Sequence, residues 1–239
     1  TGELAMSKIG MSCRDCTFNI NENGQQTSCQ LGILDIIKTK SSKCEIVDGD
    51  YQFDRICNFR TTEDKTKAEI LQEKYIRFHF IIVDTNIDKT FSILDSIEDL
   101  VTEDNRVCVA TIENFKALSL KIGNKPNYFI TNSFNEDKTV FEYMDDTFNK
   151  IKNGYTIVLH EDDKISKEDL DKVNEFINIK MNRLALIENS PFVVNNVIFK
   201  MLKGNKDTSF KDKLVELQQE QKIDSMIFSW EDINEDTSI

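Results

Sequence analysis

The 239-residue sequence has no long apolar run, only 2 prolines and 8 glycines, and no internal repeat or low-complexity tract. No apolar stretch approaches the ~20 residues that cross a bilayer, which excludes an ordinary membrane-spanning helix. The first ten residues lack the apolar centre of a secretory signal, so we expect a cytoplasmic protein that is not secreted. Residues 1–10 are interpreted as a flexible N-terminus.

Positive charge is also scarce, because 42 acidic residues outnumber 30 basic ones and give a net charge of −12. The lysines are scattered and form no basic patch. Such a protein is repelled by nucleic acid and by anionic membrane surfaces, so we expect neither as a partner. An anionic substrate would need a bound metal or helix N-termini to receive it.

Cysteine is the informative residue type, since five of the six cysteines fall before residue 58. They lie in residues 11–60, a segment with few apolar residues. Its small core would make the segment only marginally stable without a further stabilising element such as a bound metal. With no secretion signal, metal or cluster ligation explains them better than a disulfide framework. Reduced structural cysteines are the alternative. The five are Cys13, Cys16, Cys29, Cys44 and Cys57.

Four thiolates hold a structural zinc ion or a [4Fe–4S] cluster, and the spacing leaves the fourth ligand open. Cys13 and Cys16 form a C-x2-C pair, and Cys29 is the third candidate. Cys57 lies in an apolar context that would shield a cluster, whereas Cys44 lies in a polar loop. We expect Cys57 as the fourth ligand, with Cys44 as the alternative.

Residues 61–74 are predicted to be a linker helix, and residues 75–232 an α/β domain followed by an acidic tail at 233–239. Apolar runs of strand length alternate with helical periodicity, which favours a mostly parallel sheet covered by helices on both faces. Ser166 and Asp169 predict a capping box at the last helix of this alternation. The predicted strands are 77–83, 106–112, 128–134 and 155–160, and the predicted helices are 90–100, 113–121, 140–151 and 166–180. Further along, a helix at 209–221 and an apolar segment at 225–230 are expected.

The segment YTIVLHEDD, residues 155–163, is an apolar strand that ends in a histidine and three carboxylates. In a parallel sheet, ligands bind beyond the carboxyl ends of the strands. Glu161, Asp162 and Asp163 are therefore candidate ligands of a divalent cation that would hold a phosphate-bearing substrate. The alternative is a core strand followed by a solvated acidic turn. His160 is placed either at this metal or against the sheet, and His79 in the core.

The cysteine segment resembles high-potential iron–sulfur proteins in CRDCTFNINENGQQTSCQLG and in FDRICNFR. The matching positions are Cys13, Cys16, Cys29 and Cys57. The gap before Cys57 is longer than in that family, and Cys44 lies closer to the family spacing. This resemblance implies a [4Fe–4S] cluster, with Zn²⁺ as the alternative.

Residues 76–232 resemble a reduced family-2 glycosyltransferase of the GT-A fold, in FHFIIVDTNIDKTFSILDSIEDL and in GYTIVLHEDDKISKEDLDKV. Glu161-Asp162-Asp163 stands where that family has its D-x-D motif, with a glutamate in the first position. The resemblance implies an inverting transferase that binds a nucleotide-sugar donor through Mg²⁺ or Mn²⁺ and passes the sugar to an unknown acceptor.

Under the same resemblance, Asp84, Asn86 and Glu113 are the candidate nucleotide-binding residues, although helix caps and turns explain them equally well. The candidates for the general base are Glu188, Asp232 and, beside it, Glu231.

Small glycosyltransferase-like proteins of tailed phages, which carry an N-terminal cysteine cluster, look similar along most of the chain. That similarity implies a phage protein in the host cytoplasm or the virion, with virion or host proteins as partners. Two alternatives to a transferase stay open. One is a non-catalytic binding or structural protein with a degenerate GT-A domain, and the other is an electron-transfer protein.

Overall fold

The computed structural model describes residues 11–132, 154–180, 184–187, 191–197 and 225–236. The predicted helices at 140–151 and 209–221, the candidate base Glu188 and the first ten residues lie outside these ranges.

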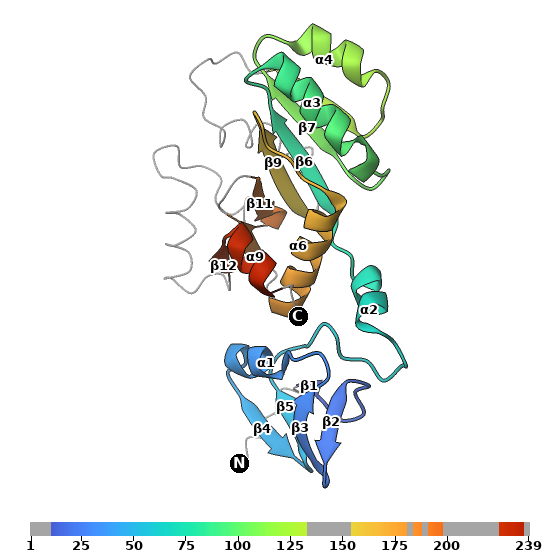
Figure 1. Ribbon diagram of the computed structural model, residues 1–239, viewed down its shortest axis with the longest axis vertical. Helices are drawn as coiled ribbons and strands as arrows, with labels where there is room; N and C mark the ends of the chain where they lie inside the picture. Colours follow the sequence, from blue (N-terminus) through green and yellow to red (C-terminus); the bar gives the residue numbers. More distant parts are fainter. Residues whose placement is uncertain (1–10, 133–153, 181–183, 188–190, 198–224, 237–239) are drawn as a thin grey trace, which may run out of the picture. The chain divides into compact units, whose positions relative to one another are not determined.

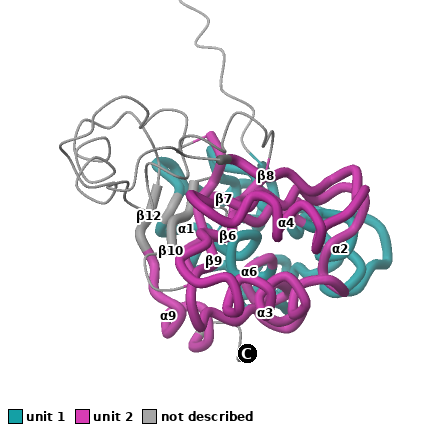
Figure 2. The backbone as a smooth tube through the Cα atoms, turned by 90° about the horizontal axis from the view of Figure 1, so that it is seen from above, with its two compact units in different colours: residues 1–75, 175–181 teal, residues 76–174, 182–239 magenta. Residues whose placement is uncertain are grey.

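The chain divides into two compact units (Figure 2). The first unit holds residues 1–75 together with 175–181, and the second holds residues 76–174 and 182–239. The helix α6 (Lys167–Lys180) therefore begins in the second unit, and its last residues group with the first.

The first unit is built from short strands and two helices. β1, β5 and β4 form a three-stranded antiparallel sheet in that order, and β2 pairs with β3 as a hairpin. The elements are β1 (Met11–Ser12), β2 (Asn19–Glu22), β3 (Gln25–Cys29), α1 (Leu34–Lys40), β4 (Cys44–Val47), β5 (Asp50–Phe53) and α2 (Lys67–Glu73).

The core of the first unit is small. Its buried members include Cys13, Cys57 and Phe59 as well as Ile179, which comes from the end of α6. Gly49 lies where two turns touch, and a Cβ there would meet the carbonyl oxygen of Gly24 at 2.0 Å. Two buried thiols thus belong to a core with few large apolar side chains.

The second unit is a seven-stranded sheet in the order β12-β10-β11-β9-β6-β7-β8. β9, β6, β7 and β8 are parallel neighbours, while β11 runs antiparallel to both β9 and β10. Every residue of β6 is buried, as expected for a central parallel strand (Figure 1). The predicted mostly parallel α/β sheet is confirmed.

The strands β6 to β9 and the helices α3, α4 and α6 start and end within three residues of the predicted ones. The predicted linker helix is shorter than expected, since α2 begins only at Lys67, and the expected acidic tail is wrong for residues 233–236, which belong to α9 with Ile233 buried. The strands are β6 (Phe78–Val83), β7 (Val107–Thr111), β8 (Tyr128–Asn132), β9 (Tyr155–His160), β10 (Leu184–Ile187), β11 (Phe192–Asn195) and β12 (Ser225–Phe228). The helices, besides α6, are α3 (Ile87–Ile97), the 3-10 turn η1 (Glu98–Leu100), α4 (Phe115–Ile122) and α9 (Trp230–Asp236).

Capping residues explain where several helices begin. Ser166 and Asp169 exchange hydrogen bonds at the start of α6, with Ser166 N–H donating to Asp169 Oδ2 at 2.8 Å, so the predicted capping box is confirmed. Thr66 and Glu69 form the same motif at α2. These hydrogen bonds join residues only three positions apart, so the local sequence determines where the two helices begin.

His79 is buried in β6, and its Nδ1 accepts the backbone N–H of Arg106 at 3.0 Å. The sequence-based placement of His79 in the core is therefore confirmed.

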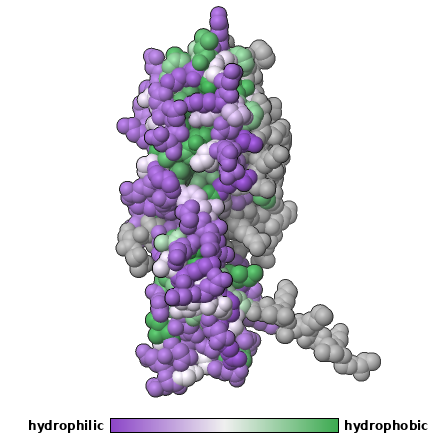
Figure 3. Space-filling view, turned by 90° about the vertical axis from the view of Figure 1, so that its right-hand side faces the viewer, coloured by the Kyte–Doolittle hydropathy of each residue, from purple (hydrophilic) through white to green (hydrophobic). Residues whose placement is uncertain are grey.

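On the face drawn in Figure 3, hydrophilic side chains predominate, in line with a charged content of 30%. Among the described helices, none is long and apolar enough to cross a membrane.

Candidate functional sites

The centre of the second unit contains a switch in strand order. From β6 the chain adds β7 and β8 on one side, and then returns to place β9 on the other side of β6. In open parallel sheets, such a reversal leaves a crevice at the carboxyl ends of the two strands, where ligands bind. Here Val83 and His160 are register partners at those ends. Asp84 and Glu161, the next residues of the two strands, therefore begin neighbouring loops.

Asp84 is held by three donors. Its Oδ1 accepts a hydrogen bond from Thr90 Oγ1 at 2.7 Å, and its Oδ2 accepts bonds from Thr111 Oγ1 at 2.7 Å and Asn114 Nδ2 at 2.9 Å. Thr111 is fully buried at the end of β7. The carboxylate therefore ties the loops after β6 and β7 together. Thr111 and Asn114 were not predicted as site residues, although Thr111 is a polar residue ending an apolar strand.

The other two candidate nucleotide contacts, Asn86 after β6 and Glu113 after β7, differ in role. Asn86 caps α3, because its Oδ1 accepts the backbone N–H groups of Asp88 and Lys89. Glu113 is exposed just before α4 and is not its cap. The Asn86 side chain is thus already engaged as a helix cap, whereas the exposed Glu113 has no such capping role.

The three carboxylates after β9 take different directions. Glu161 adopts a left-handed backbone conformation with φ of 52°, which turns the chain sharply. Asp162 Oδ2 pairs with Lys89 Nζ at 2.9 Å, and this pair raises the pKa of Lys89. Asp163 turns back, so that its Oδ2 lies 2.7 Å from His160 Nδ1 and also accepts the His160 backbone N–H.

This acidic edge, Glu161–Asp163, has the donor chemistry of a Mg²⁺ or Mn²⁺ site, since both cations prefer carboxylate oxygen. Glu161 and Asp162 are exposed. Within the described ranges, however, no three His, Cys, Asp or Glu side chains are grouped so as to hold an ion. A cation at this edge would compete with Lys89 for Asp162 Oδ2.

The candidate base Asp232 caps α9. Its Oδ2 accepts hydrogen bonds from Ser229 N–H at 2.6 Å and Ser229 Oγ at 3.0 Å. Glu231 is exposed in the first turn of the same helix. The contacts of Asp232 account for its position without catalysis.

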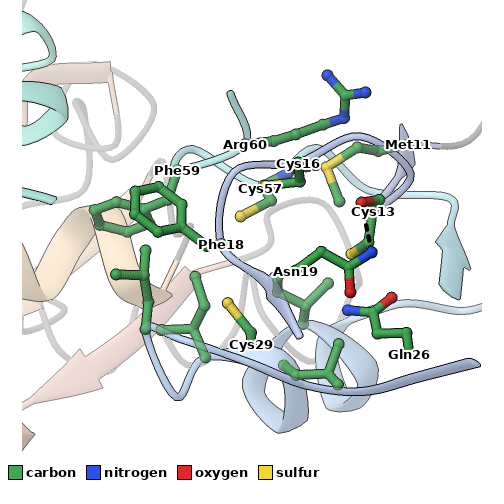
Figure 4. A pocket seen from close by; sticks show the side chains of 14 residues that line it. Met11, Cys13, Cys16, Phe18, Asn19, Gln26, Cys29, Cys57, Phe59 and Arg60 are labelled. Atoms are coloured by element: carbon green, nitrogen blue, oxygen red, sulfur yellow. Dashed lines mark hydrogen bonds between the residues drawn. The ribbon is translucent and has the colours of Figure 1, made fainter. Parts of the chain in front are cut away.

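In the first unit, four cysteines from three segments line one pocket (Figure 4). Cys13 and Cys16 come from the chain between β1 and β2, Cys29 ends β3, and Cys57 follows β5. We call this the cysteine pocket. Apolar side chains complete most of its wall, among them Phe18, Leu31, Ile33, Leu34, Ile37 and Phe59.

Burial first, and then repulsion from the neighbouring groups, raises the pKa of the Cys13, Cys29 and Cys57 thiols. Burial, together with repulsion from Cys29, Cys13 and Cys16, raises the pKa of the Cys57 thiol to about 12. Hydrogen-bond donors act in the opposite direction. The backbone N–H groups of residues 31–33 partly lower the pKa of Cys29, and that of Phe59 partly lowers the pKa of Cys57. Donors aimed at buried sulfur suit thiolates bound to a metal.

The fifth cysteine of the segment, Cys44, is exposed in β4 and does not line the cysteine pocket. Cys57 is only 8% exposed and does. The pocket thus contains the four cysteines expected as ligands, including Cys57 in place of Cys44.

Taken together, the chain is an α/β protein with a polar edge at the switch point of a parallel sheet and a separate four-cysteine pocket. No protein-family model matches the sequence, and no curated protein does.

Among solved structures, S. aureus TarS 1–349 is 14% identical with a TM-score of 0.49, over 64% of this chain and 58% of that one. TarS 1–349 in complex with UDP-GlcNAc is 16% identical with a TM-score of 0.46, over 58% and 53% of the two chains. Rv0371C from Mycobacterium tuberculosis H37Rv, in complex with manganese, is 7% identical with a TM-score of 0.41, over 64% and 88%. The chain thus spans little more than half of TarS 1–349, and its fold class rests on its own strand order.

Proposed function

We propose that the second unit binds a nucleotide sugar at the carboxyl edge of β6 and β9, as a glycosyltransferase-like domain. The observation that carries the proposal is the register of Val83 with His160, which brings Asp84 and the acidic edge to one switch point. The resemblance of residues 76–232 to family-2 glycosyltransferases supports the same ligand class.

A divalent cation at this edge would neutralise the diphosphate and favour departure of the leaving group. Glu161 and Asp162 are the exposed carboxylates available to it. Asp163 orients His160, and Asp84 fixes the loops after β6 and β7. The residues of this chain therefore position the ligand and supply oxygen donors.

Thermal unfolding of the whole protein with UDP- and GDP-sugars and Mn²⁺ tests this proposal. A ligand at 100 times its Kd stabilises the folded state by about 2.7 kcal/mol, so binding gives a measurable rise in Tm. The double variant Glu161→Gln/Asp162→Asn should lose the rise. Glu103→Gln, an exposed carboxylate before β7, should keep it. The proposal fails if no nucleotide sugar raises the Tm, or if the double variant responds like the wild type.

A non-catalytic binding protein is the second candidate, and the capping role of Asp232 favours it because that carboxylate is engaged as a cap. Measuring whether free nucleoside diphosphate is released from the bound donor distinguishes the transferase from the binding protein. Turnover supports a transferase, whereas binding without turnover supports a binding protein.

For the first unit we propose a metal centre held by Cys13, Cys16, Cys29 and Cys57, and a [4Fe–4S] cluster in preference to zinc. Zinc needs its sulfurs about 2.3 Å from one point. The described cysteines share a pocket but are not grouped around a single ion. In a cluster each thiolate binds a different iron, which allows the sulfurs to stand further apart.

Anaerobic purification tests the centre independently of nucleotide binding. A cluster gives a brown protein with iron and acid-labile sulfide in equal amounts, and Cys44→Ser should retain both. A colourless protein with stoichiometric zinc contradicts the cluster, and a protein without metal contradicts the whole centre. Alkylation of the native protein adds a test that needs no variant. Cys44 should react at once, and the four pocket cysteines only after a chelator removes the metal.

A further inference from the structure

Lys89 brings a positive charge to the acidic edge of the second unit. It lies in the first turn of α3, and its Nζ is 2.9 Å from Asp162 Oδ2 in the loop after β9. The strands β6 and β9, which precede these two segments, are parallel neighbours (Figure 1). The ion pair therefore joins the two loops that border the switch point. Its side chains are 41% and 81% exposed, so a ligand can reach both of them from solvent.

The backbone N–H groups at the start of α3 are already bonded. Those of Asp88 and Lys89 donate to Asn86 Oδ1 at 3.1 and 3.2 Å, and that of Thr90 donates to Asn86 O at 2.9 Å. A helix N-terminus binds phosphate through N–H groups that point at the ligand, and a cap occupies such groups. Asp88 also adds negative charge to this turn. A phosphate at this end of α3 therefore needs a side-chain cation.

The chemistry of a nucleotide sugar matches this need. Its diphosphate is anionic, and the exposed carboxylates Glu161 and Asp162 repel it. Mg²⁺ in nucleotide sites is held by one or two carboxylates together with phosphates of the substrate. Lysine binds phosphate as a point charge. A divalent cation at Asp162 and the ammonium group of Lys89 can therefore receive the diphosphate together.

We propose that Lys89 binds the diphosphate of the donor, and that its ion pair with Asp162 is the resting arrangement which the donor replaces. The inference rests on the proposed nucleotide-sugar site. On binding, Lys89 Nζ exchanges the Asp162 carboxylate for a phosphate oxygen, and Asp162 Oδ2 becomes available to a divalent cation. Each of the two side chains gains a new partner of opposite charge, so neither is left unpaired at the edge.

Calorimetric titration of Lys89→Met in the full chain tests the exchange, because its two halves predict effects of opposite sign. Mn²⁺ alone should bind up to about fivefold more tightly than to the wild type, since Asp162 is released. UDP or GDP with saturating Mn²⁺ should bind about tenfold more weakly, since a hydrogen bond between charged groups is lost. A general loss of structure would weaken both ligands.

Two further variants separate the contact from the charge. Lys89→Arg keeps a cation that binds phosphate, so UDP and GDP should bind it about as tightly as the wild type. Lys164→Met removes the same charge from an exposed lysine that follows Asp163, but leaves the pair of Lys89 with Asp162 intact. Both of its affinities should match those of the wild type.

The outcomes distinguish this inference from the proposed site. Undiminished UDP and GDP binding by Lys89→Met overturns the diphosphate contact, and equal weakening by Lys164→Met overturns a specific role for Lys89. Weaker binding of Mn²⁺ alone to Lys89→Met overturns the exchange. A wild-type protein that binds neither UDP nor GDP refutes the nucleotide-sugar site itself, and this is seen before any variant is made.

Discussion

Asp84 Oδ2 accepts a hydrogen bond from Thr111 Oγ1 at 2.7 Å, across the carboxyl ends of two adjacent parallel strands. Asp84→Ala would leave the fully buried Thr111 hydroxyl without this acceptor. Because hydrogen bonds to a charged group are worth about 1.5–3 kcal/mol, we expect the free energy of unfolding to fall by about 2–3 kcal/mol. Urea unfolding followed by the fluorescence of Trp230, the single tryptophan, measures it. The exposed Asp99→Ala should change it by less than about 0.5 kcal/mol.

The left-handed conformation of Glu161 predicts a gain in stability on substitution by glycine. The left-handed region costs a residue with a Cβ about 1–2 kcal/mol, while glycine loses about 0.5–1 kcal/mol more entropy on folding. Glu161→Gly should therefore raise the free energy of unfolding by about 0.5–1 kcal/mol while weakening Mn²⁺ binding. Asp162→Gly, without such strain, should lower it. A Glu161→Gly protein less stable than the wild type would contradict the strain.

The ion pair of Lys89 with Asp162 predicts competition with a metal. Lys89→Met frees the carboxylate and removes a positive charge, so Mn²⁺ should bind more tightly. Because water screens this exposed pair, the gain should not exceed about fivefold. Calorimetric titration of Mn²⁺ without nucleotide measures it, with the exposed Lys116→Met as the control. Unchanged or weaker binding would show that the pair does not compete.

Gly154 precedes β9 at a close approach of two backbones. A Cβ there would meet the carbonyl oxygen of Arg77 at 2.3 Å, and that same oxygen accepts the Tyr155 N–H at 2.9 Å. Gly154→Ala should therefore destabilise the second unit more than Gly123→Ala, which also has positive φ but meets no atom within 4 Å. We expect a difference of about 1–3 kcal/mol in urea unfolding. Equal losses would mean that the clash is relieved by a backbone shift.

The capping box of α2 predicts a pH dependence. The backbone N–H and then the side chain of Thr66 hold the pKa of Glu69 below its ordinary value of 4.5. The carboxylate therefore stabilises the folded state above pH 4.5, and this stabilisation is lost as the pH falls through the lower folded-state pKa. Hydrogen exchange in α2 should be faster in Glu69→Ala than in the wild type at pH 7, with the two converging at acidic pH. A constant difference at every pH would refute the link to ionisation.

Local chemistry in the sequence was sufficient for several features. The apolar runs of β6 and β9 and the Ser166–Asp169 capping box depend on neighbours a few residues away, so pattern and spacing reveal them. The cysteine segment was also visible, because five thiols among few apolar residues have few other uses.

The sequence by itself determined the alternation of strands and helices, the acidic end of β9 and a set of candidate thiols. Only the tertiary structure decided that β9 returns beside β6, that Asp163 faces His160 and Asp162 faces Lys89, and that Cys57 and not Cys44 lines the pocket. The physical reason is the separation along the sequence between the residues that interact. Caps and periodicity depend on residues only a few positions apart. Strand pairing and a shared pocket depend on contacts between distant segments, which no local pattern in the sequence encodes.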